Sequence, residues 1–328
     1  MRLRMGPATV AIAAVAGEAV LFAAIALTGG GGAATADEAR AGVRAAGWAH
    51  SRTATTGSTG ETPAAIPARL PGGGTQVFEG NRFLVAYYGT AGTGALGVLG
   101  EGPPDRVHRR LVRAAAPFAR PGSPVQPVYE LIVTVADAYP GKDGDYNHDI
   151  PRAAVRRYID AAHRNGALVV LDIQPGRANF LSVARRWAWA LQDPWVGLAL
   201  DPEWRMAPHS VPGRVIGSVH AREVNRVSAW LSGLVAQRAL PEKLFVLHQF
   251  RTSMLQRPER IVRRPGLALV QHVDGFGTPG QKLDTYRAVA RPRQFAMGFK
   301  LFYDEDVPRM RAAAVRRVRP VVRFVSFQ

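Results

Sequence analysis

The sequence predicts an α/β protein folded as a (β/α)8 barrel of the TIM type, with the last helix missing. Short apolar runs recur eight times after residue 80, and stretches with helical spacing separate most of them. The runs are apolar throughout, which is typical of parallel strands buried on both faces. Eight such strands in about 250 residues is the usual size of this barrel. A doubly wound open sheet is the alternative that the same pattern allows.

The predicted strands share β-branched and aromatic residues, which favour a pleated, buried surface. They span residues 83–88, 125–131, 167–173, 196–200, 244–249, 267–272, 294–301 and 321–327. Because the last run ends beside the final residue of the sequence, we expect no eighth helix after it.

The predicted helices share apolar residues three and four positions apart. They span residues 105–119, 150–165, 179–192, 221–238, 280–289 and 308–317. Pro151 at a first turn and the Asn165-Gly166 step after a helix are typical helix boundaries. Between the fifth and sixth strands the connection is short, and only a weak helix is expected there, at 258–264.

Residues 1–36 carry the pattern of a signal peptide. Two arginines, Arg2 and Arg4, precede an apolar stretch at 8–27, and small residues lead up to Asp37. The stretch is about 20 residues long, which also suits an uncleaved membrane anchor. The protein is therefore predicted to be secreted, or anchored on the outer face of the cytoplasmic membrane.

Residues 37–78 are rich in Ala, Gly, Thr and Pro and show no lasting periodicity. This composition predicts a flexible linker. The barrel domain is expected to occupy the remaining residues, 79–328.

Composition excludes several kinds of chemistry. The chain has no cysteine, so disulfides, thiolate metal sites and cysteine nucleophiles are excluded.

Its formal net charge is +17, but only four of its 42 cationic residues are lysines. The sequence has no basic motif with aromatic residues between the basic ones, so no nucleic-acid partner is predicted. After an export signal, an anionic cell wall or membrane surface is the expected neighbour.

Polar side chains gather at the predicted ends of the strands, where (β/α)8 barrels carry their catalytic groups. The fourth strand has the clearest pattern, because its apolar run leads into Asp201-Pro202-Glu203-Trp204. Residues two positions apart project from the same side of a strand, so Asp201 and Glu203 are expected to lie together. Glycosidic cleavage needs such a pair, one carboxyl to protonate the leaving oxygen and one ionised group. The indole of Trp204, next to this pair, excludes water and so helps to separate the pKa values of the two carboxyls.

This Asp-x-Glu motif resembles the one at the fourth strand of chitinase-like and barrel-type muramidase glycosidases. By that resemblance Glu203 is the general acid and Asp201 its helper. The longer chitinase signature is absent, since residues 197–200 are Gly-Leu-Ala-Leu. Asp172 and Glu130 are therefore the alternative candidates for the second carboxylate.

Further side chains at the strand ends are predicted to bind substrate. These are Tyr87, Tyr88, Gln174, Trp204, His248, Gln249, His272, Asp274, Lys300 and Tyr303. The polar loop 138–149 is expected to be a substrate-binding loop or a Ca²⁺ loop, although it lacks EF-hand spacing.

The leading hypothesis is an exported glycoside hydrolase that cleaves a cell-envelope or extracellular polysaccharide by carboxylate acid/base catalysis, without a metal or other cofactor. One alternative is a non-catalytic barrel that binds envelope glycans. Another is a metal-dependent hydrolase or deacetylase, because His248 and His272 end the fifth and sixth strands, as metal ligands do in amidohydrolase barrels. That family also has a His-x-His on the first strand, where this chain has Ala86-Tyr87-Tyr88.

Overall fold

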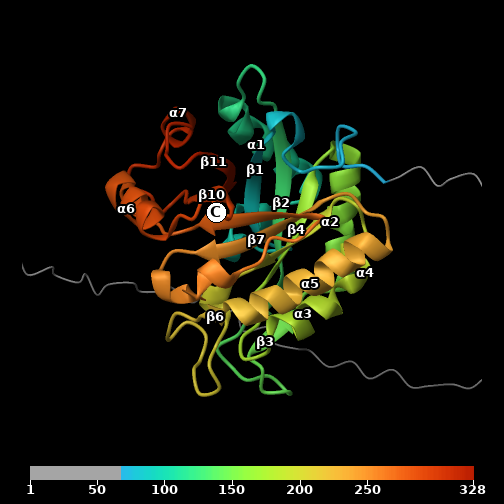
Figure 1. Cartoon of the computed structure of the whole chain (residues 1–328), viewed down its shortest axis with the longest axis vertical. Helices are drawn as coiled ribbons and strands as arrows, with labels where there is room; N and C mark the ends of the chain where they lie inside the picture. The colour runs from blue at the N-terminus through green and yellow to red at the C-terminus, as the bar shows by residue number, and fades with distance from the viewer. Residues whose placement is uncertain (1–67) are drawn as a thin grey trace, which may run out of the picture. The chain divides into compact units, whose positions relative to one another are not determined.

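The computed structural model describes residues Ala68–Gln328, in which eight parallel strands close into a barrel (Figure 1). The first strand, β1 (Phe83–Thr90), pairs with β2 (Val125–Ala136) on one side and with β11 (Val322–Phe327) on the other, which closes the sheet. The strands between them are β4 (Leu168–Ile173), β5 (Val196–Leu200), β7 (Lys243–Gln249), β9 (Leu267–Val273) and β10 (Ala296–Leu301). The predicted (β/α)8 barrel is confirmed, and each of the eight apolar runs forms one of its strands.

One strand is longer than its apolar run predicts. β2 continues to Ala136 and pairs there with β3 (Asn147–Asp149), the only antiparallel partner in the described sheet. β3 is the end of the polar stretch expected to be a loop. Side-chain contacts hold it in place, because the Thr134 hydroxyl donates to Asp149 at 2.6 Å and His148 Nδ1 lies 2.7 Å from Asp137.

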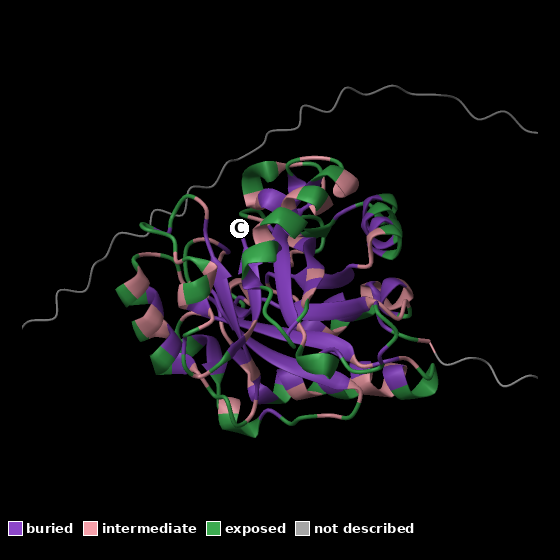
Figure 2. Cartoon of the chain, turned by 90° about the horizontal axis from the view of Figure 1, so that it is seen from above, coloured by how far each residue is buried: buried purple, intermediate pink, exposed green. Residues whose placement is uncertain are grey.

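Helices cover the outside of the barrel. The four long ones lie where the periodicity predicts them: α1 (Pro104–Ala115), α2 (Arg152–Asn165), α5 (Ala221–Gln237) and α6 (Pro279–Val289). Gly166 ends α2 in the left-handed conformation with φ of 64°, which glycine adopts without a steric penalty. The strands are buried, whereas the outward faces of the helices are exposed (Figure 2).

Two predicted helices are shorter than expected. Residues 179–192 form α3 (Phe180–Arg186) and α4 (Ala188–Leu191), which are separated at Trp187. The Trp187 indole is buried and donates to the Thr134 hydroxyl at 2.9 Å. In the segment 308–317 only α7 (Ala312–Val315) is helical, because it has a single buried side chain to pack against the core. No helix follows β11 in the described chain.

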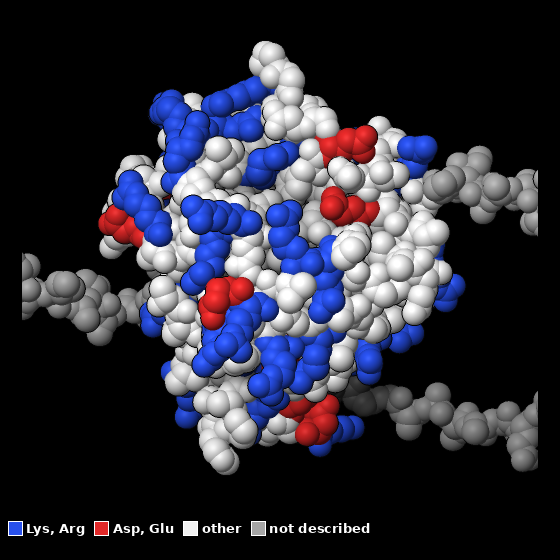
Figure 3. Space-filling model, viewed as in Figure 1, with Lys and Arg blue, Asp and Glu red and all other residues white. Residues whose placement is uncertain are grey.

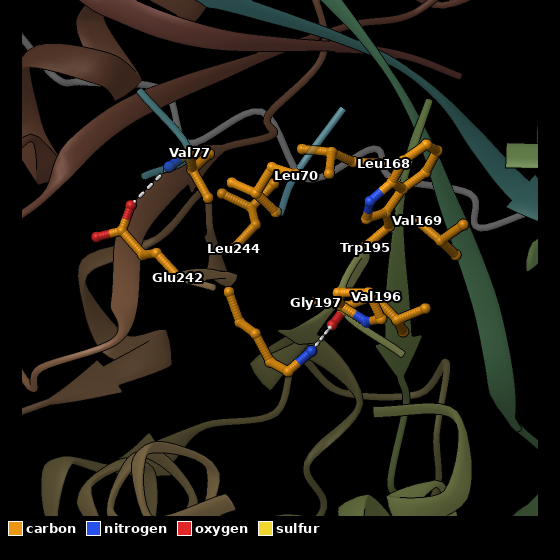
Figure 4. A pocket seen from close by; sticks show the side chains of 11 residues that line it. Leu70, Val77, Leu168, Val169, Trp195, Val196, Gly197, Glu242 and Leu244 are labelled. Atoms are coloured by element: carbon orange, nitrogen blue, oxygen red, sulfur yellow. Dashed lines mark hydrogen bonds between the residues drawn. The ribbon is translucent and has the colours of Figure 1, made fainter. Parts of the chain in front are cut away.

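Residues 68–78 lie at the N-terminal ends of the barrel strands, although the composition placed them in the linker. Leu70 and Val77 are buried against the first residues of β4 and β7. The backbone N–H of Val77 donates to the Glu242 carboxylate at 2.7 Å (Figure 4). The predicted leader and the rest of the linker lie outside the described residues. No helix from residue 68 onward is both long and apolar enough to cross a membrane.

Lys243 makes the stability of this end of the barrel depend on pH. Its ammonium is buried and donates to the carbonyl oxygens of Asp193 and Val196 at 2.8 and 2.7 Å. Burial lowers the pKa of Lys243 from 10.5 to about 7. Between these two values the unfolded chain binds one more proton than the folded chain, so this contribution to stability increases as the pH rises.

We therefore expect the free energy of unfolding of the wild type, relative to Lys243→Met, to increase between pH 7 and pH 10. The limiting slope for one proton is about 1.4 kcal/mol per pH unit. Denaturant unfolding across this pH range measures it. Lys142→Met, at an exposed lysine, is the control and should show no such slope. Parallel curves for the wild type and Lys243→Met would contradict the expectation.

Candidate active site at the C-terminal end of the barrel

The C-terminal half of the barrel interior is lined by polar side chains. The opposite half is apolar, with residues such as Ala86, Val128, Val170 and Val246 in one buried cluster. Successive side chains of a strand alternate between its two faces, so the next inward residue lies two positions further along the strand. In each strand this next inward residue is polar. Every barrel strand contributes one such residue, and each is at most 4% exposed: Tyr88, Glu130, Asp172, Asp201, His248, His272, Lys300 and Ser326.

His248, the inward residue near the end of β7, lies at the centre of this cluster. Its Nδ1 lies 3.0 Å from a carboxylate oxygen of Asp274, which directly follows β9. Its Nε2 faces Glu130 at 3.2 Å and Asp172 at 3.7 Å. Both Nε2 distances are those of ion pairs, although neither contact has the alignment of a hydrogen bond. Both ring nitrogens therefore face carboxylates brought from three other strands.

These contacts determine which groups are charged. Burial alone would lower the pKa of His248, but its contacts with Asp274, Glu130 and Asp172 outweigh burial and hold that pKa well above its ordinary value. His248 is thus an imidazolium at neutral pH. Burial raises the pKa of Asp274, but the hydrogen bond and the charge of His248 outweigh it and lower that pKa overall. The pair consists of a buried cation and an ionised carboxylate.

Two other aspartates hold protons more tightly than exposed acids do. Burial is the main cause that raises the pKa of Asp172, and the charge of Glu130 adds to it. Burial also raises the pKa of Asp201 well above its ordinary value, and the carboxylates of Asp172 and Glu203 raise it further. The charge of His248 opposes both shifts. The cluster therefore combines ionised and proton-holding carboxyl groups at neighbouring positions.

The remaining inward residues complete the cluster. The Lys300 ammonium lies 3.4 Å from the centre of the Tyr88 ring, a cation–π contact. Gln174 accepts a hydrogen bond from the Ala136 backbone, and its amide nitrogen lies 3.4 Å from the Tyr88 hydroxyl. Burial, and next the charge of His248, lower the pKa of His272, so this imidazole is neutral.

Glu203 lies beside this cluster and is better exposed than its acids. It belongs to the 3₁₀ turn Pro202–Trp204 after β5, where its backbone N–H donates to the Asp201 carboxylate at 3.2 Å. Among the five acids Glu130, Asp172, Asp201, Glu203 and Asp274, only Glu203 is half-buried and not buried. The Gly217 N–H donates to the Glu203 carbonyl at 2.6 Å. A Cβ at Gly217 would lie 2.5 Å from that oxygen, so only glycine allows the loop to hold the turn this closely.

A buried ion pair fixes the loop that carries Asp274. Lys282 of α6 lies 3.0 Å from the Asp306 carboxylate, and both side chains are at most 1% exposed. Lys282 also donates to the Gly275 carbonyl at 2.7 Å, and Asp306 accepts from the backbone N–H groups of Gly277 and Phe302. The loop after β9 is thus tied to the loop after β10, which holds Asp274 against His248.

The structure does not bring four of the predicted substrate-binding residues into the cluster. Tyr87 and Tyr303 contact each other through their hydroxyls at 3.1 Å, in the outer core beneath α1. Gln249 accepts a hydrogen bond from Gln271 at 2.6 Å, and Gln271 itself contacts the end of α6, so both side chains face outward. Trp204 lies half-buried on the 3₁₀ turn with Glu203. Of the other predicted site residues, Glu203 lies beside the cluster, and the rest belong to it.

One member of the cluster, Ser326, is not among the residues that the sequence predicts. Its hydroxyl lies 3.2 Å from His272 Nε2, and the residue is fully buried. Ser326 lies two positions after Phe324 on the same face of β11, but both faces of this strand are largely buried, so its sequence does not show which face points inward. Among the described residues, no group of three or more His, Asp or Glu side chains has the arrangement of a metal site.

No protein-family model matches the chain, and no curated protein matches it.

Proposed function

We propose that this protein is a glycoside hydrolase that cleaves a cell-envelope or extracellular polysaccharide, with Glu203 as the general acid. The observation that carries this proposal is the position of half-buried Glu203 next to buried Asp201 at the C-terminal end of the barrel, where the Glu203 backbone N–H donates to the Asp201 carboxyl at 3.2 Å. Glycosidases need a carboxyl that can reach the leaving oxygen, together with a second carboxyl whose protonation differs. Glu203 has the exposure for the first role.

Asp201 suits the supporting role. It is 3% exposed, it holds its proton more tightly than an exposed aspartate, and it accepts a hydrogen bond from the backbone of Glu203. A proton on Asp201 leaves less negative charge beside Glu203 while Glu203 becomes ionised on donating its own proton. Asp172 and Glu130 lie deeper, beside the His248 imidazolium, whose positive charge opposes the effect of burial on Asp172, and they are the candidates for the second carboxylate.

The full-length chain, incubated with peptidoglycan, chitin, arabinan, galactan and mannan, tests this proposal. Release of new reducing ends from at least one of these glycans is expected. The anomer formed first, followed by NMR, distinguishes retention from inversion and so shows whether the second carboxylate acts as nucleophile or as base. No release from any glycan of the panel, under conditions where the protein is folded, would contradict the proposal.

A non-catalytic glycan-binding barrel is the second candidate, and the burial of the inner acids favours it. Glu130 and Asp172 are both fully buried, whereas a catalytic base must reach its substrate. Such a barrel would retain a glycan saturably without releasing reducing ends. The same panel therefore separates the two candidates.

The place of action is also a proposal. The leader pattern at residues 1–36 supports export, followed by release or by anchoring on the outer face of the cytoplasmic membrane. A polysaccharide substrate is accessible in either case.

A further inference from the structure

The outer wall of the barrel between α5 and β10 carries a group of exposed arginines, which we call the basic wall. Its members are Arg226 on α5, Arg257, Arg260 and Arg263 in the connection from β7 to β9, and Arg291 and Arg293 before β10. Lys and Arg side chains gather over the middle of the face on which α5 lies (Figure 3).

The basic wall exists because this part of the barrel has no covering α-helix. The connection from β7 to β9 contains no α-helix, only the 3₁₀ turns Thr252–Met254 and Pro258–Arg260 and the two-residue strand β8 (Leu255–Gln256). Asn225 of α5 fixes it on one side, donating to the Arg260 carbonyl and accepting from the Val262 backbone, both at 2.8 Å. Gln294 fixes it on the other side, donating to the carbonyls of Pro258 and Ile261. These hydrogen bonds bring three separate segments into one surface.

The basic wall keeps a net positive charge. Glu259 lies within it, between Arg257 and Arg260, and the charge of Arg263 acts on the Glu242 carboxyl, so two carboxylates offset part of the charge of the six arginines. On the wall formed by α1 and α2, ion pairs offset part of the charge, as Arg110 pairs with Glu101 and Arg164 with Asp105. Other arginines of that wall, among them Arg106, Arg109, Arg113 and Arg157, form no ion pair within the described residues. Within the described residues, none of the six arginines of the basic wall forms an ion pair with a carboxylate. An anionic partner would relieve the mutual repulsion of these arginines.

We propose that the basic wall binds the anionic surface of a phospholipid bilayer. Guanidinium groups match phosphate oxygens in a two-pronged geometry. Val262 lies among the arginines and is 48% exposed, which suits contact with the headgroup region. The apolar stretch at residues 8–27, which the sequence predicts to be part of a signal peptide or a membrane anchor, also supports a membrane as the partner. This inference does not depend on the proposed hydrolase activity.

Binding through the basic wall orients the barrel. Because the wall is on the side of the barrel and not at either end, the barrel axis lies along the membrane plane. The C-terminal end with Glu203 then opens along the membrane and faces polymers close to its surface.

Sedimentation of the full-length chain with vesicles tests the proposal. One set of vesicles is phosphatidylcholine alone and the other is an equal mixture with phosphatidylglycerol. The N-terminal apolar stretch affects both sets alike, so the difference between them reports the basic wall. We expect binding to the anionic vesicles to be at least about tenfold tighter, and the difference to shrink as salt is added.

The variant that neutralises Arg257, Arg260, Arg263 and Arg291 to glutamine should lose most of this preference. Its matched control neutralises the exposed arginines Arg106, Arg109, Arg113 and Arg157 of α1 and α2, the same change of charge, and should keep the preference within about twofold. Equal losses in the two variants would overturn the proposal, since total charge would then explain binding. So would equal binding of the wild type to both vesicle sets. Binding to a soluble polyphosphate but not to anionic vesicles would replace the bilayer by a wall polymer.

The salt titration of the wild type is a second test that needs no variant. A preference for anionic vesicles that persists unchanged at high salt would contradict an electrostatic surface of exposed arginines.

Discussion

Glu203→Gln is expected to lower kcat for glycan cleavage about 10²–10⁴-fold and to leave glycan binding within a few-fold of the wild type. Glutamine keeps the size and hydrogen-bonding capacity of the side chain but has no proton to donate to the leaving oxygen. Since the backbone of Glu203 is held by Asp201 and Gly217, the substitution should not disturb the turn. Reducing-end assays on the glycan that the wild type cleaves measure kcat, and retention on the same glycan measures binding.

Glu305→Gln is the matched control, because Glu305 is an exposed acid in the loop after β10. It should keep the wild-type kcat. If Glu203→Gln also kept it, Glu203 would not be the general acid, and the assignment of Asp201 as its support would fail with it. An unchanged kcat in Glu203→Gln would not contradict the proposed membrane binding by the basic wall, since vesicle binding is a separate measurement.

Removal of the central cation is expected to have the largest effect on stability. His248→Leu leaves the carboxylates of Glu130, Asp172 and Asp274 buried without their shared partner. Loss of one partner from a buried ion pair costs about 3–5 kcal/mol, because the remaining charge keeps its desolvation penalty. Denaturant unfolding at neutral pH measures this difference.

A double-mutant cycle with Asp274→Asn shows whether the cost comes from this contact. Asp274→Asn should destabilise the wild type more than it destabilises His248→Leu, with a coupling energy of about 1–3 kcal/mol. His209→Leu, at an exposed histidine, is the control and should stay within about 0.5 kcal/mol of the wild type. A His248→Leu variant as stable as that control would show that the buried carboxylates do not depend on the imidazolium.

The strand ends predicted which residues gather in the buried cluster better than they predicted the geometry of these residues. Asp201 and Glu203 are adjacent, as their spacing implies, but Asp201 is buried while Glu203 is half-buried. The sequence pattern predicts that both lie at the open C-terminal end of the barrel. The 3₁₀ turn causes the difference, because it follows Asp201 at once and directs the chain away from the barrel axis.

Neighbouring residues at the end of a strand point to opposite faces of the sheet, and the sequence did not reveal which of them points inward. Tyr88 faces the cluster whereas Tyr87 faces α1, and His248 is central whereas Gln249 faces Gln271. In a half-exposed strand, polarity would reveal which of two neighbours points inward. In these strands both faces are buried, so polar and apolar residues do not alternate along the sequence. The sequence therefore does not show which side chains point into the barrel.

The sequence by itself determined the eight strands, the order in which helices separate them, and the concentration of acids and imidazoles at the strand ends. These follow from local hydrophobicity and from the rule that parallel strands end at one rim. Only the tertiary structure decided that His248 is the shared partner of Glu130, Asp172 and Asp274, because these residues come from four different strands. It likewise decided that the arginines around Arg260 form one wall, since the hydrogen bonds of Asn225 and Gln294 join segments that lie far apart in the chain. Local patterns carry no information on such long-range contacts, which arise when the barrel closes.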